Sequence, residues 1–241
     1  LVRVVEIPKT DASFSTDVTR FNNSQNAIGV KDFVSLDPFQ QRLRRELDRD
    51  FAISYVIRSG EDSSESQIPS ISLQEATVAL VACGKSVENA VRVKDKISVL
   101  WRDIESAPYT TIFDQARVTP LALYKAVSAN RVVEDFLKER VDKAKEGESV
   151  TDWERGRAVA THGNRLFAFY VLSGINLWRA EQSVEEFEDK VKQIDFDLHF
   201  DALVREVFQN HGEAYKAPLF KNRAKCGAII QALDPVKRPE I

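Results

Sequence analysis

The stretch LDPFQQRLRREL, residues 36–47, is where the local signals of this chain agree most closely. Asp37 is a favoured N-cap, and Pro38 is favoured at the first helical position because its fixed φ suits a helix. Gln40 occupies the position of a capping-box partner. One apolar stripe follows, with a hydrophobic residue at every fourth position: Phe39, Leu43 and Leu47. The sequence therefore predicts an amphipathic helix that begins at Pro38.

Strand-like segments lie on both sides of this helix. Leu1–Ile7 is rich in β-branched residues and is followed by Pro8, and Phe51–Arg58 alternates apolar and polar positions. A single short strand is not stable alone, so these strands either pair with each other or complete a sheet begun upstream. We favour the second arrangement. Residues 1–60 are thus predicted to be a small α/β segment.

The rest of the chain is predicted to be helical. Residues 61–70 are acidic and Ser-rich, which indicates a surface loop, and residues 71–241 form a helical region. Capping-box patterns begin at three positions: Ser72, Thr151 and Ser183. The predicted helices include four segments: 87–105, 119–145, 151–178 and one that opens at Ala217-Pro218. The fold class is therefore α+β and predominantly α, with strands near 1–7 and 51–58 before a bundle-like helical region.

Composition excludes several classes of protein. The 241 residues carry a formal net charge of −3, so no global field favours nucleic acid or an anionic membrane. No apolar run reaches the roughly 18 residues of a membrane span, so we expect no membrane association. Cys83 and Cys226 lie on apolar helical patterns and are predicted to be buried free thiols in a reducing cytoplasm.

Four amide side chains stand close together before the helix: Asn22, Asn23, Gln25 and Asn26. Asn and Gln can pair bidentately with adenine, so the cluster is a candidate binding site for nucleic acid. The alternative is that these side chains cap a helix end and satisfy turn backbone, and we favour that structural role.

Arginines on the helix after Pro38 are a second candidate. Arg42 and Arg45 could contact phosphates, but acidic residues interleave with them, which is typical of a solvated helix surface. Direct binding would need a basic patch assembled with other segments.

His162 and Arg165 flank a glycine inside an otherwise helical run. Close helix packing explains Gly163, and a polar contact through His162 is the alternative. The histidine spacings match no metal site, and no phosphate loop or nucleophile motif is present, so we predict neither a metal nor a cofactor. The catalytic residues, if any exist, are unknown, and the sequence leaves open whether the chain is an enzyme.

Several of these segments together resemble the AIPR (abortive infection phage resistance) family. The resemblance is carried by three N-terminal motifs, Asn23-Ser24-Gln25-Asn26, Leu36-Asp37-Pro38-Phe39-Gln40 and Ser54-Tyr55-Val56. It continues through three downstream motifs, Ile71–Ala76, Leu100-Trp101 and Tyr109–Phe113, and covers residues 1–125. The family's upstream Asn-Asn-Gly and Asn-Gly-x-Gln-Thr elements are missing, so the resemblance implies the C-terminal half of an AIPR region.

The resemblance implies a bacterial, cytoplasmic phage-defence protein in which this chain recognises a nucleic acid or a phage or host protein. Two alternatives come from other classes. The chain could be part of a nuclease-type effector whose catalytic residues lie upstream, or a helical dimerisation module that forms a homodimer. An exposed apolar stripe on residues 120–145 would favour the dimerisation module.

Overall fold

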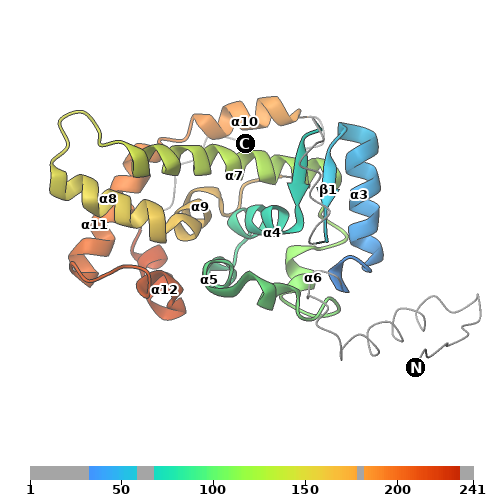
Figure 1. The fold of residues 1–241 in the computed structure, drawn as a ribbon, viewed down its shortest axis with the longest axis horizontal. Helices are drawn as coiled ribbons and strands as arrows, with labels where there is room; N and C mark the ends of the chain where they lie inside the picture. The colour runs from blue at the N-terminus through green and yellow to red at the C-terminus, as the bar shows by residue number, and fades with distance from the viewer. Residues whose placement is uncertain (1–32, 59–67, 178–181, 234–241) are drawn as a thin grey trace, which may run out of the picture. The chain divides into compact units, whose positions relative to one another are not determined.

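The computed structural model describes residues 33–58, 68–177 and 182–233 (Figure 1). Contacts along the chain divide it into two compact units, Leu1–Ser70 and Ile71–Ile241. The predicted strand at residues 1–7 and the amide cluster lie outside the described residues.

In the first unit, helix α3 (Pro38–Phe51) begins as the sequence predicts. The Asp37 carboxylate accepts a hydrogen bond from the Phe39 N–H at 2.9 Å, which satisfies one of the unpaired amides at the helix start. The predicted apolar stripe is fully buried: Phe39, Leu43 and Leu47. The helix ends at Ala52, whose φ of 52° is left-handed and turns the chain toward the next strand.

The capping-box assignment of Gln40 is wrong. The Asp37 N–H, which a capping-box partner would bind, donates instead to the Val34 carbonyl at 3.1 Å. Gln40 is fully buried, and its Oε1 accepts a hydrogen bond from the Tyr55 hydroxyl at 2.8 Å. This buried polar pair therefore joins α3 to the strand that follows it.

That strand, β1 (Ser54–Val56), is shorter than the predicted segment 51–58 because α3 continues through Phe51. It pairs in parallel with β2 (Ser70–Ser72), and the Ser54 N–H donates to the Pro69 carbonyl at 2.9 Å. The described part of the chain is thus predominantly α-helical with a small α/β part, and the predicted fold class is confirmed.

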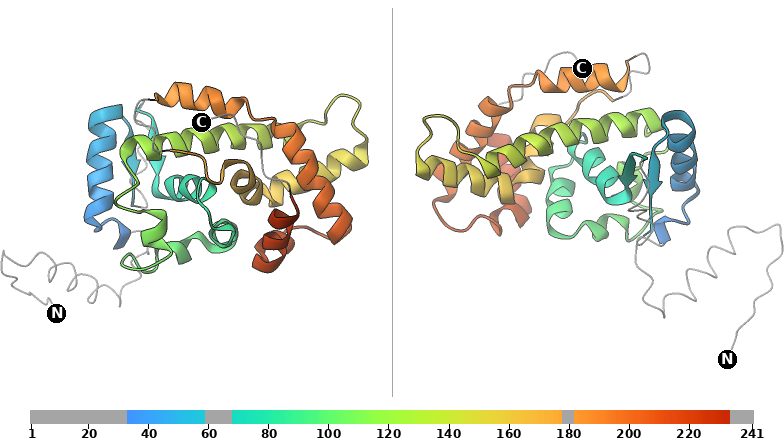
Figure 2. Two further views of the ribbon diagram at one scale, coloured as in Figure 1. Left: turned by 180° about the vertical axis from the view of Figure 1, so that it is seen from behind. Right: turned by 45° about the horizontal axis from the view of Figure 1, so that its top comes forward.

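The second unit is built around its longest helix, α7. Its α-helices in chain order are α4 (Leu73–Ala82), α5 (Val87–Lys96), α6 (Tyr109–Ile112), α7 (Pro120–Asp142), α8 (Val150–His162), α9 (Asn164–Leu172), α10 (Val184–Lys192), α11 (Phe196–His211) and α12 (Arg223–Ala232). Figures 1 and 2 show α10 along one side of α7 and α4 and α9 along the other. α5 packs against α9, and α12 against α5, so the helices form successive layers.

Eleven of the 23 residues of helix α7 are buried, including Lys125 and Arg140. Among the described residues, the exposed large hydrophobic side chains lie elsewhere: Ile68, Val150, Leu198 and Tyr215. The exposed apolar stripe that would favour a dimerisation module is therefore not found on the described residues of segment 120–145.

One predicted helix ends earlier than expected, and another begins later. The helix predicted over 87–105 is wrong in length, because α5 stops at Lys96 and continues as a 3₁₀ segment, η1 (Ile97–Trp101). The Trp101 indole is buried and donates to the Thr77 hydroxyl at 2.9 Å, which holds η1 against α4. The C-terminal helix predicted from Pro218 begins later. A short 3₁₀ segment, η2 (Leu219–Lys221), precedes α12.

The helix predicted over 151–178 is also wrong, because two helices meet at Gly163. A Cβ built at Gly163 would lie 2.6 Å from the Phe220 ring, so the close packing proposed for this glycine is confirmed. The cap of α8 is Ser149 and not Thr151, since the Ser149 hydroxyl accepts the Asp152 N–H at 3.1 Å. The capping box at Ser183 is confirmed.

Candidate functional site

The binding residues predicted from sequence fall in different parts of the chain. The amide cluster, Asn22, Asn23, Gln25 and Asn26, lies outside the described residues. Arg42 and Arg45 are exposed on α3 in the first unit. The Arg42 guanidinium lies 4.9 Å from the centre of the Phe39 ring and 3.9 Å from Glu46, so its local contacts are those of a solvated helix surface.

His162 and Arg165 lie at the break between α8 and α9 in the second unit. Arg165 pairs with Glu134 on α7, with 2.5 Å between Nη1 and Oε1. The His162 ring makes an edge contact with the exposed Tyr215 ring, at 5.0 Å between centroids. Partial burial and the nearby Lys94 ammonium lower the pKa of His162, which favours the neutral imidazole. These contacts connect the end of α8 to Tyr215 and the start of α9 to α7.

A more developed polar site lies elsewhere, where the loop between α7 and α8 faces α11. The loop and the three helices α7, α8 and α11 line a cleft of about 650 Å³, here called the charged cleft. Its charged residues comprise four cations, Arg140, Lys145, Arg155 and Arg205, and four carboxylates, Glu146, Glu148, Asp152 and Asp201.

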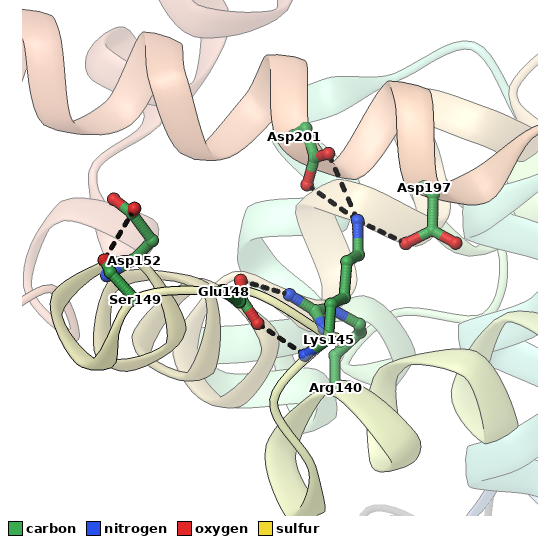
Figure 3. Close-up of polar contacts among 7 residues, drawn as sticks. All are labelled: Arg140, Lys145, Glu148, Ser149, Asp152, Asp197 and Asp201. Atoms are coloured by element: carbon green, nitrogen blue, oxygen red, sulfur yellow. Dashed lines mark hydrogen bonds and ion pairs between the residues drawn. The ribbon is translucent and has the colours of Figure 1, made fainter.

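Glu148 fixes the conformation of the loop (Figure 3). One carboxylate oxygen accepts from the Arg140 guanidinium at 2.8 Å, and the other accepts from the Lys145 backbone N–H at 2.7 Å. Burial raises the pKa of Glu148, but these hydrogen bonds and the two cations outweigh it, so the pKa lies below its usual value. Arg140 is almost fully buried, and its guanidinium lies over the Phe200 ring.

Lys145 joins the loop to α11. Its Nζ lies 2.5 Å from Asp197 and 3.1 Å from Asp201, which are one helical turn apart (Figure 3). Burial opposes the charge of Lys145, but the two carboxylates outweigh that effect and raise its pKa. Lys145 therefore stays protonated and ties the loop to α11.

Three exposed side chains that line the cleft take no part in these hydrogen bonds and ion pairs. Within the described residues, Arg205, Glu146 and Gln209 make no hydrogen bond or ion pair, and all three are exposed. They offer a cation, a carboxylate and an amide to an incoming molecule. The internal pairs need not break when these groups bind.

Most of the charged groups at the cleft are engaged in ion pairs within the protein. Three carboxylates, Glu148, Asp197 and Asp201, are each paired with a cation. In residues 33–58, 68–177 and 182–233, no group of His, Cys, Asp or Glu could hold a metal ion. Both cysteines are buried free thiols, as predicted, and burial raises the pKa of Cys226 to about 11.

Sequence reasoning missed the charged cleft. The sequence predicts a helix over 119–145 and marks none of the residues that follow it as part of a site. One usable signal was the spacing of Asp197 and Asp201, which places both carboxylates on one helix face. The contact with Lys145 spans more than 50 residues and has no local signature.

Fold and site together describe a predominantly helical protein with a cleft lined by charges of both signs. A family model described as AIPR protein matches residues 1–210, and the chain belongs to this family. The match extends beyond the segment of resemblance, residues 1–125. Family membership is consistent with a phage-defence protein.

No curated protein and no solved structure gives a significant match to the chain. Among the helices that the structure describes, none has the length and apolar character required to cross a membrane.

Proposed function

We propose that this chain is the recognition portion of a cytoplasmic, bacterial phage-defence protein and that the charged cleft contacts a partner protein. The family supports the defence role. The proposal of a protein partner rests on the balance of positive and negative charge in the cleft.

Four cations and four carboxylates line the cleft, so its net formal charge is zero. A nucleic-acid site relies on cations that neutralise phosphates, and the four carboxylates here would repel them. A polypeptide surface presents charges of both signs and backbone amides, which such a lining can match. A protein partner therefore suits the cleft better than DNA or RNA does.

The rim of the cleft supports the same partner. Arg205, Glu146 and Gln209 are exposed and can form new charge pairs and hydrogen bonds. Two exposed apolar side chains are next in sequence to residues of the loop and of α11: Val150, 70% exposed, follows the cap of α8, and Leu198, 63% exposed, follows Asp197. Apolar contacts among polar groups are typical of protein interfaces.

Other proposals remain for the segment that the structure does not describe. The cluster at Asn22–Asn26 is a candidate contact for nucleic acid. An effector enzyme with catalytic residues outside this chain is a further alternative. Neither has a supporting contact among the described residues.

A phage-challenge assay with the full-length protein tests the proposal. We expect Arg205→Glu to abolish protection, measured as efficiency of plating, because it reverses the charge of an unused rim cation. Its stability should change by no more than about 0.5 kcal/mol, since Arg205 is exposed and makes no pair within the described residues. Arg102→Glu is the matched control, because Arg102 is also exposed and lies outside the cleft.

Two results would contradict the proposal. Full protection by a stable Arg205→Glu protein would remove the cleft from the recognition surface. Salt-dependent binding of duplex DNA that is lost in Arg205→Glu would make nucleic acid the partner instead.

A further inference from the structure

A second cavity, of about 770 Å³, lies in the helical unit and is separate from the charged cleft. It is called here the α5 cavity because the start of α5 forms one wall. The end of α4, the α6 helix and the segment after α9 form the other walls. Its size falls within the range of small-molecule sites, about 300–1,000 Å³.

Asn89 is the unusual residue of the α5 cavity. It is 9% exposed, and its side-chain amide has no hydrogen-bond partner in the part of the chain that the structure describes. Neither amide atom is sealed from solvent, and Asn89 lines the cavity, so the amide opens into it. An amide that has no partner within the protein and reaches the cavity can offer both a donor and an acceptor to a bound molecule.

Positive charge lies beside this amide. Lys85 precedes the α5 cap and lines the cavity, is exposed, and makes no ion pair within the described residues. Arg117 is a second cation of the lining, and Asp114 is its one carboxylate. The start of α5, capped by Ser86, adds the partial positive charge of a helix N-terminus. The α5 cavity therefore favours an anionic group, whereas the charged cleft is balanced.

The remaining wall is apolar. It is formed by six largely buried side chains: Leu80, Val81, Ile112, Val118, Ile175 and Leu177. Such a wall can cover the face of a flat ring while the Asn89 amide contacts the edge of the ring. Asn pairs bidentately with the N6/N7 edge of adenine.

We propose that the α5 cavity binds a nucleotide, with an adenine base against Asn89 and the apolar wall and with the phosphate near Lys85. No step of the proposed partner recognition requires this site. The two sites can therefore be tested separately on the same protein.

The test is calorimetric titration of the full-length protein with adenosine 5′-monophosphate. We expect binding, and we expect Asn89→Ala to weaken it about tenfold because one bidentate base contact is lost. Lys85→Ala should weaken binding of the monophosphate and leave binding of adenosine unchanged. Asn210→Ala, an exposed amide on α11, is the control and should leave both affinities unchanged.

The absence of measurable binding of the monophosphate would overturn the proposal, as would equal affinities of wild type and Asn89→Ala. Equal loss of adenosine and monophosphate binding in Lys85→Ala would overturn the placement of the phosphate. Wild-type nucleotide affinity in Arg205→Glu is expected. That result separates a failure of the nucleotide site from a failure of the charged cleft.

Discussion

At the scale of single residues, the ion pair of Arg140 and Glu148 makes the charged cleft sensitive to pH. Their side chains are 6% and 13% exposed, so the removal of one partner leaves a buried charge without compensation. We expect Glu148→Gln to lower the free energy of unfolding by about 1–3 kcal/mol at pH 7, measured by urea denaturation.

The pH dependence has a definite sign. The pKa of Glu148 in the folded state lies below the value of 4.5 for an unperturbed group. Its contribution to stability is therefore fully present above that value and is lost as pH falls through the folded-state pKa. The difference in the free energy of unfolding between wild type and Glu148→Gln should therefore become smaller as the pH falls below 4.5. Glu146→Gln is the neighbouring control, because Glu146 is exposed and makes no pair within the described residues. An undiminished difference at pH 3 would show that the carboxylate charge is unimportant.

At the scale of elements, Gly163, at the break between α8 and α9, packs closely against a ring from another part of the chain. A Cβ at Gly163 would meet the Phe220 ring at 2.6 Å, whereas a Cβ at Gly156 would meet Arg140 and Phe200 at an ordinary 3.5 Å. We expect Gly163→Ala to destabilise the protein by about 1–3 kcal/mol through overpacking. Gly156→Ala should be neutral or stabilising by up to about 1 kcal/mol, because it removes a glycine from a helix.

Thermal unfolding of the two variants measures this difference in stability, because both replace Gly by Ala, one inside α8 and one at its C-terminal cap. A Gly163→Ala protein as stable as Gly156→Ala would mean that Phe220 moves aside at little cost. The length of α8 would then depend on local sequence rather than on this contact.

Local chemistry accounts for the elements that the sequence predicted well. Asp37-Pro38 and Ser183 start helices through contacts within three residues, so their signals are present in the sequence itself. The close packing of Gly163 against Phe220 joins residues 57 positions apart, and no local pattern reveals that contact. The charged cleft was missed for the same reason, since it requires the α7–α8 loop to meet α11. Asn89 also carries no signal, because its lack of a partner appears only after folding.

At the scale of the whole molecule, the division into two compact units predicts two separate unfolding events. All three tryptophans, Trp101, Trp153 and Trp178, belong to Ile71–Ile241, so their fluorescence reports on that unit. Leu47 is fully buried in the first unit, and Leu47→Ala should cost that unit about 2–5 kcal/mol. Because each unit has its own buried core, we expect an earlier loss of part of the helical circular dichroism and an unchanged midpoint for tryptophan fluorescence.

Leu123→Ala provides the reciprocal variant, because Leu123 is fully buried on α7 in the second unit. It should lower the midpoint of the fluorescence transition, since the helices of that unit pack around α7. If Leu47→Ala shifted the fluorescence midpoint by the same amount, the two units would unfold as one. The charged cleft and the α5 cavity both lie within Ile71–Ile241, so independent unfolding predicts that Leu47→Ala leaves nucleotide binding intact.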